Sequence, residues 1–169
     1  MSLPFIEPDY DIHLNLAMVL VIVHLLGVTN RGTLKVNNER LHVFLYLLRN
    51  PVKLNALLNV LGKGSIILSE QSTYSVSSIS SNVDSLFDRA ALKSLISILI
   101  TKNLIEVVYK NNDGFFYKTT VKGASAIDNL SDEYIYENKL LCEKLKKVLP
   151  LSESHLNQAL NQVIRKESI

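Results

Sequence analysis

The sequence has few of the residues that build covalent cross-links or metal sites. Its 169 residues include one cysteine and no tryptophan. The single thiol, Cys142, excludes an internal disulfide framework and a zinc site made of several cysteines. A chain of this length usually forms one domain, or one domain with an appendage. The apolar fraction of 47% is too high, and the net charge too small, for a disordered chain.

An excess of charge of one sign is also missing. Lysine and arginine number 18 and aspartate and glutamate 16, so the net charge is 18 − 16 = +2. This balance argues against a protein that is held on nucleic acid by a strong overall positive field.

No hydrophobic run is long enough to cross a membrane. The most apolar stretch, residues 14–26, is interrupted by Asn15 and His24 and falls short of the roughly 20 residues that a bilayer needs. It predicts a helix that is buried nearly all round. Residues 1–9 have no basic region and carry two prolines, so they do not resemble a secretory signal. We expect a soluble, cytoplasmic protein with no membrane partner.

What the sequence does have is leucine, at 29 positions, in stripes with helical spacing. Capping residues, prolines and glycines set the expected ends of the helices. The expected helices are residues 12–26 after Asp11, a helix ending at Arg49 and capped by Asn37 or Asn38, one from Pro51 to Leu61, 89–102 after Asp88, 121–130, 132–149, and a last helix capped by Ser152.

Two β-prone segments, 104–110 and 115–120, flank a turn, Asn111-Asn112-Asp113-Gly114, that is typical of a hairpin. Helix, helix, helix and hairpin is the order of a winged helix-turn-helix domain; the alternative is a generic α+β domain with one hairpin. The predicted fold is therefore mainly α with a β-hairpin wing: a winged helix-turn-helix-like core with an extra N-terminal helix and C-terminal helices.

Three segments follow from this arrangement. Residues 1–36 form an N-terminal segment whose apolar helix packs on the core. Residues 37–130 form the winged-helix-like domain, with an insertion at 65–85 that contains nine serines. Residues 131–169 form a C-terminal helical extension.

The helix at 89–102 occupies the place of a DNA-reading helix. Its expected outward strip, Lys93, Ser94, Ser97 and Thr101, has no asparagine, glutamine or central arginine for bidentate contacts with bases. We expect at most a weak, sequence-independent contact with DNA. The candidate phosphate-contacting residues are Arg89, Lys93, Lys102, Lys110 and Lys118.

The last helix carries an apolar stripe with two open interpretations. It can pack on its own domain or bind a partner. The candidate partner-binding residues are Leu156, Leu160, Val163 and Ile164.

No motif predicts catalysis, a metal or a cofactor. Gly62-Lys63-Gly64-Ser65 follows a helix and lacks the first glycine of a phosphate-binding loop. The four histidines lie in four different segments, and Cys142 has no histidine nearby in the sequence. Asp84 and Asp88 suggest a cation site, but capping of a helix by Asp88 explains the pair more simply. We expect a protein that is not an enzyme and has no small-molecule substrate.

Several segments together resemble a known family. They are Pro4-Phe5-Ile6-Glu7-Pro8-Asp9-Tyr10-Asp11, Leu47-Leu48-Arg49-Asn50-Pro51-Val52-Lys53-Leu54-Asn55, Ser80-Ser81-Asn82-Val83-Asp84-Ser85-Leu86-Phe87-Asp88, Lys102-Asn103-Leu104-Ile105-Glu106-Val107 and Asp113-Gly114-Phe115-Phe116-Tyr117. The chain resembles the middle component of ABC-three-component systems, including the small subunit of Lamassu-type bacterial defence complexes.

The resemblance implies a non-catalytic adaptor subunit. It would bridge the heads of an SMC-like, ABC-type ATPase and an effector nuclease in antiviral or antiplasmid defence. It carries over no catalytic residue. The alternative from the order of the elements is a winged-helix transcription regulator.

Overall fold

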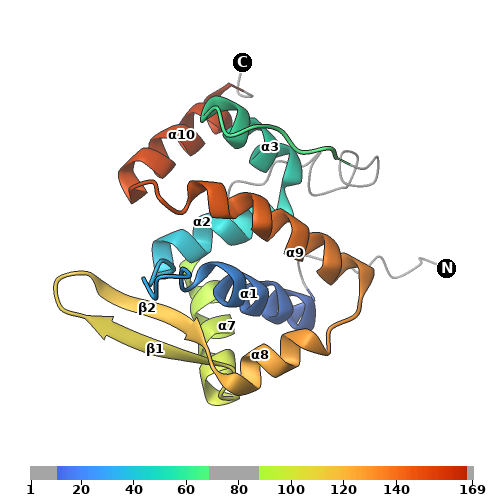
Figure 1. Ribbon diagram of the computed structural model, residues 1–169, viewed down its shortest axis with the longest axis vertical. Coiled ribbons are helices and arrows are strands. Elements are labelled where there is room, and N and C mark those ends of the chain that lie inside the picture. The colour runs from blue at the N-terminus through green and yellow to red at the C-terminus, as the bar shows by residue number, and fades with distance from the viewer. Residues whose placement is uncertain (1–10, 69–87, 167–169) are drawn as a thin grey trace.

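The computed structural model describes residues 11–68 and 88–166 and is mainly helical, with one antiparallel hairpin (Figure 1). This agrees with the predicted helix-rich, winged-helix-like fold. The described elements, in chain order, are α1 (Ile12–Leu26), α2 (Asn38–Arg49), α3 (Pro51–Val60), α7 (Arg89–Thr101), β1 (Ile105–Lys110), β2 (Gly114–Thr119), α8 (Val121–Asp128), α9 (Glu133–Leu145), the 3-10 helix η2 (Lys146–Val148) and α10 (Glu153–Arg165).

Polar side chains cap the helices where the sequence predicts them. Each cap accepts hydrogen bonds from backbone N–H groups of the first turn, which have no partner within the helix. The capping residues are Asp11 for α1, Asn37 for α2, Asp88 for α7 and Ser152 for α10. Most of the serine-rich insertion at 65–85, including Asp84, lies outside the described residues, as do residues 1–10.

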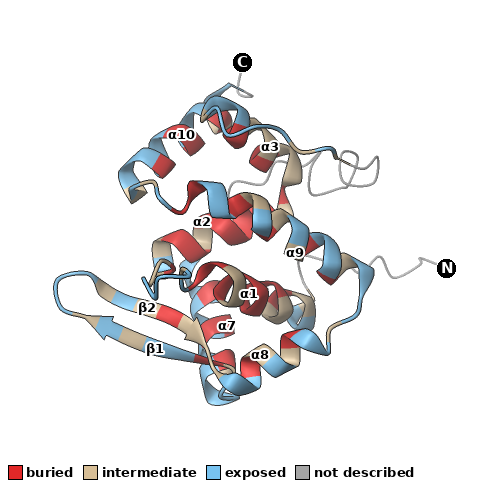
Figure 2. Cartoon of the chain, viewed as in Figure 1, coloured by how far each residue is buried: buried red, intermediate tan, exposed pale blue. Residues whose placement is uncertain are grey.

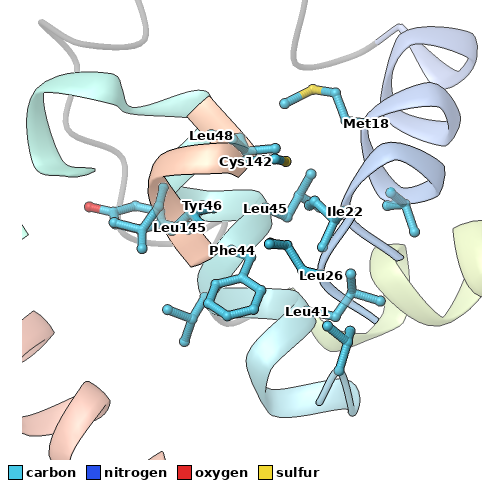
Figure 3. Packing of buried hydrophobic residues seen from close by; sticks show 14 of the residues in the cluster. Met18, Ile22, Leu26, Leu41, Phe44, Leu45, Tyr46, Leu48, Cys142 and Leu145 are labelled. Atoms are coloured by element: carbon cyan, nitrogen blue, oxygen red, sulfur yellow. The ribbon is translucent and has the colours of Figure 1, made fainter. Parts of the chain in front are cut away.

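Helix α1 is the centre of the molecule. It packs against α2, α7, α8, α9 and β2, and residues 18–23 are all buried, as expected for the apolar stretch at 14–26 (Figure 2). The N-terminal helix, which the sequence predicts to pack on the core, forms the middle of the core in the structure. Figure 3 shows side chains of α1, α2 and α9 meeting there, namely Met18, Ile22 and Leu26 with Leu41, Phe44, Leu45, Tyr46 and Leu48 and with Cys142 and Leu145.

The base of the hairpin is attached to the segment that follows α1. The N–H of Tyr117 in β2 donates to the carbonyl oxygen of Val36 over 2.9 Å. The Tyr117 hydroxyl donates to Oδ1 of Asn38 at the start of α2 over 2.6 Å. Gly27 lies so close to β2 that an added Cβ would stand 2.9 Å from the Tyr117 carbonyl oxygen and 2.3 Å from that of Val23. A side chain here would push the hairpin off the core, whereas the tip of the hairpin projects away from the helices (Figure 1).

Helices α3 and α10 pack on each other at the opposite end of the molecule (Figure 1). The order of the elements in the sequence predicts α2, α3 and α7 as the three successive helices of the winged helix. In the structure α3 packs chiefly against α2 and α10, while α1 contacts α2, α7 and β2. Only one residue, Asn50, separates α3 from α2 in the chain. Helix α3 nevertheless packs its apolar face on the C-terminal helix α10, so the order of helices along the chain does not give their packing partners.

Candidate interaction surface

A pocket of about 430 Å³ lies where α2, α7 and β2 meet. Its floor is apolar, since Leu92 and Ile96 of α7 are 3% and 6% exposed. Polar groups surround this floor. The lining residues are Asn38, His42, Arg89, Leu92, Lys93, Ile96, Ser97 and Tyr117.

The outward strip of α7 is exposed, as the helical spacing predicts, and two of its residues, Lys93 and Ser97, line this pocket. Its hydroxyl groups are used within the helix: Ser94 Oγ donates to the Ala90 carbonyl, Ser97 Oγ to that of Lys93 and Thr101 Oγ1 to that of Ser97. These donors are therefore occupied by backbone acceptors, which leaves α7 with little capacity to donate hydrogen bonds to DNA bases.

Arg89 and Lys93 are the two cationic side chains that line the pocket, and they differ in their partners. Arg89 is paired with Glu39, with Nη1 2.7 Å from Oε1 and Nη2 3.3 Å from Oε2. Lys93, in contrast, has no carboxylate within ion-pair distance among residues 11–68 and 88–166.

His42 lies beside these cations. Burial lowers the pKa of His42, and the charge of Arg89 lowers it further, against the opposing effects of Glu39 and Asp88. The imidazole is therefore neutral at neutral pH, so Lys93 is the pocket's one lining cation without a carboxylate partner in the described part of the chain.

The remaining candidate phosphate-contacting lysines do not gather with this pair. Lys118 of β2 is 2.9 Å from Glu106 of β1, and Lys110 lies over the Phe116 ring, 5.7 Å from its centroid. Lys102 is exposed at the far end of α7. Of the five candidates, the pocket brings together only Arg89 and Lys93, so the structure shows no continuous basic track through them.

The hairpin carries an exposed apolar surface that the sequence analysis missed. Val107, Tyr109 and Phe115, here named the wing strip, are 42%, 62% and 57% exposed, and the last two rings have centroids 5.2 Å apart. Strand register places Val107 opposite Tyr117, which lines the pocket. Alternation of apolar residues along β1, continuing beyond the buried Ile105, is the sequence signal that could have revealed it.

The apolar stripe of α10 faces α3 inside the chain. Leu156, Leu160 and Val163 are at most 3% exposed and Ile164 is half-buried. Of the two interpretations of this stripe, the structure shows packing on the chain itself. These candidate partner-binding residues are therefore packed against α3 in the single chain.

Other groups singled out in the sequence lie apart. Cys142 is fully buried in α9, and burial raises the pKa of its thiol far above the ordinary value. Within residues 11–68 and 88–166 no three histidine, cysteine, aspartate or glutamate side chains gather to hold a metal ion. No described helix is long and apolar enough to cross a membrane.

Comparison with protein families decides the relationship. The model of the family described as ABC-three component (ABC-3C) system Middle Component 4 matches residues 26–158, well over half of the chain. The chain belongs to this family. The match confirms the resemblance to a middle component and spans every described element except most of α1 and the second half of α10. Comparisons with curated proteins and with solved structures gave no match.

Proposed function

We propose that this Middle Component 4 protein is a non-catalytic adaptor. It bridges the SMC-like, ABC-type ATPase and an effector nuclease of its system, in Lamassu-type antiviral or antiplasmid defence in the cytoplasm. Membership of the family gives an accessory role in an ABC-three-component system. The observation that carries the adaptor role is the exposed wing strip beside a pocket, because aromatic side chains are enriched where proteins bind one another.

The groups in the pocket support a binding role over a catalytic one. Ser97 and His42 both line it, but the Ser97 hydroxyl donates to the Lys93 carbonyl of its own helix. A nucleophilic serine would instead donate to the imidazole that activates it. The buried thiol of Cys142 lacks the exposure and the lowered pKa of a nucleophilic cysteine.

Co-expression with the other two components of its system tests the proposal. With an affinity tag on the ATPase component, we expect the chain to co-purify in fixed stoichiometry and to be needed for recruitment of the third component. Protection of cells against phage or plasmid, with and without this gene, gives the functional readout. If the ATPase and the third component assemble and protect cells equally well without the chain, the adaptor role is wrong.

Contact with DNA is a secondary part of the proposal. The donors of α7 are occupied, and two of the candidate cations, Arg89 and Lys118, are paired with glutamates, so we expect weak, salt-sensitive binding without sequence preference. Fluorescence anisotropy with random and promoter duplexes measures it. A preference of about a thousandfold or more for the promoter would favour the transcription regulator instead.

A further inference from the structure

The wing strip adjoins the pocket through one cross-strand pair of the hairpin. Val107 pairs with Tyr117 across the hairpin, and Tyr117 is both a lining residue of the pocket and bonded to Asn38 of α2. The Tyr109 and Phe115 rings extend the same face of the hairpin toward its tip. An occupant can therefore lie along the hairpin and reach the apolar floor between α2 and α7.

Charge indicates what this occupant carries. Arg89 has its carboxylate partner in Glu39, whereas Lys93 stands at the pocket with none among the described residues. One unneutralised cation beside an apolar floor complements one carboxylate attached to an apolar segment.

The same charges disfavour nucleic acid. A phosphate backbone needs several cations along its path, yet here it would meet the Glu39 carboxylate beside Arg89. Side chains of a strand point alternately to its two faces, and Lys110 and Lys118 are each next in sequence to a residue on the face of the wing strip. They therefore lie on the opposite face of the hairpin.

A second copy of the chain is also a poor fit. In a twofold contact the surface would meet itself, and Lys93 would need a carboxylate from the copy's own surface. Two carboxylates act on the pocket residue His42: Glu39 is already bonded to Arg89, and Asp88 caps α7 by accepting from the Ala91 N–H.

We propose that the wing strip and the pocket bind a segment of another component of the ABC-three-component system, with apolar side chains on Tyr109 and Phe115 and an aspartate or glutamate paired with Lys93. This inference rests on the proposed adaptor function and identifies the surface that performs it. Exposed aromatic residues at the centre of such a contact are the residue type that contributes most to binding.

The test compares two pairs of exposed apolar side chains in the full chain, co-purified with the tagged ATPase and third components. The wing variant is Tyr109→Ser with Phe115→Ser. The matched control is Tyr136→Ser with Leu140→Ser on α9, where the side chains are 62% and 49% exposed. We expect the wing variant to lose affinity about tenfold or more and the α9 control to keep it, with unchanged thermal midpoints for both.

Charge reversal tests the second half of the proposal. Lys93→Glu should weaken the same complex, while Lys166→Glu, at an exposed position after α10, should not. A photo-crosslinking amino acid at position 109 identifies the partner segment, and reversing its acidic residue to lysine should restore binding of Lys93→Glu.

Each other outcome overturns the inference. If the wing and Lys93 variants bind as the wild type does, the docking surface is wrong while the adaptor role stands. If the wild type binds neither component, both fail together. If the wing variant loses only self-association in size-exclusion chromatography, the occupant is a second copy. If the wing variant loses only its binding to random duplex DNA, measured by fluorescence anisotropy, the occupant is nucleic acid.

Discussion

Two apolar surfaces at opposite ends of this molecule differ in burial: one is covered by another helix and the other is exposed. On the apolar stripe of α10, Leu156, Leu160 and Val163 are buried, each at most 3% exposed, where the helix packs on α3. The wing strip remains between 42% and 62% exposed. The difference lies in the element that covers each surface. α10 packs against α3, whose Leu54, Leu57 and Leu58 are fully buried, whereas the outer half of the hairpin extends past the last helix that packs on it (Figure 1).

This difference separates stability from binding. Burying one leucine or valine side chain contributes about 1.5–3 kcal/mol, so the α10 stripe stabilises the fold of the single chain. The wing strip gains no such contribution while it is exposed, and the same free energy is released only when another surface covers it. An apolar stripe in the sequence is thus not sufficient to identify a partner site.

The largest expected effect is on the covered surface. Leu160→Ala removes buried methyl groups between α10 and α3 and should lower the free energy of unfolding by about 2–5 kcal/mol. Urea denaturation followed by circular dichroism measures it, with Gln158→Ala at an exposed position of α10 as the control. A loss below about 0.5 kcal/mol, the range of ordinary surface substitutions, would show that α10 is not packed on α3.

Thiol labelling compares the two surfaces directly. Ala159→Cys places a small thiol under α3, and Tyr109→Cys places one on the exposed wing. The native Cys142 is a built-in reference, since burial and a raised pKa make it unreactive while the chain is folded. We expect the wing thiol to react with Ellman's reagent about a hundredfold faster than the α10 thiol, because the latter requires local opening. Equal rates would mean that the two surfaces do not differ.

Local features of the fold were predictable from the sequence. The limits of α1, α2 and the hairpin follow from caps and turn residues that act over three or four positions, such as Asp11 before α1. The inward residues of α7 follow from helical spacing, and Leu92, Leu95, Ile96 and Leu99 are indeed its buried residues. These predictions succeed because each depends on neighbours in the chain.

The candidate site was only partly predictable, because it depends on residues far apart in the chain. Arg89 was proposed as a phosphate contact, but its pairing with Glu39 spans 50 positions. Gly27 follows the last residue of α1 with a φ of −63°, which any residue can adopt, so the need for glycine there comes from the close approach of β2. Whether the α10 stripe was covered depended on where α3 lies, which no local pattern specifies.

A polar contact adds to the apolar packing of α10. Arg40 of α2 is buried, and its guanidinium donates to the carbonyl oxygens of Leu149 and Leu151 just before the helix. Arg40→Met keeps the apolar stem but leaves both carbonyls without this donor, so we expect a loss of about 1–3 kcal/mol in the free energy of unfolding. The control is Arg165→Met at an exposed position of α10. Equal stabilities for the two variants would mean that packing alone holds α10 in place.

The smallest effect on the free energy of unfolding is expected for an ion pair on the hairpin. Lys118 and Glu106 form a half-exposed ion pair on the face of the hairpin opposite to the wing strip. A double-mutant cycle with Lys118→Ala and Glu106→Ala should give a coupling energy of about 0–1 kcal/mol, because water and side-chain entropy offset the attraction. The coupling should vanish near about 1 M salt, where the screening length is short. A coupling that persisted there would mean that this ion pair is shielded from solvent, contrary to the half-exposed side chains of the structure.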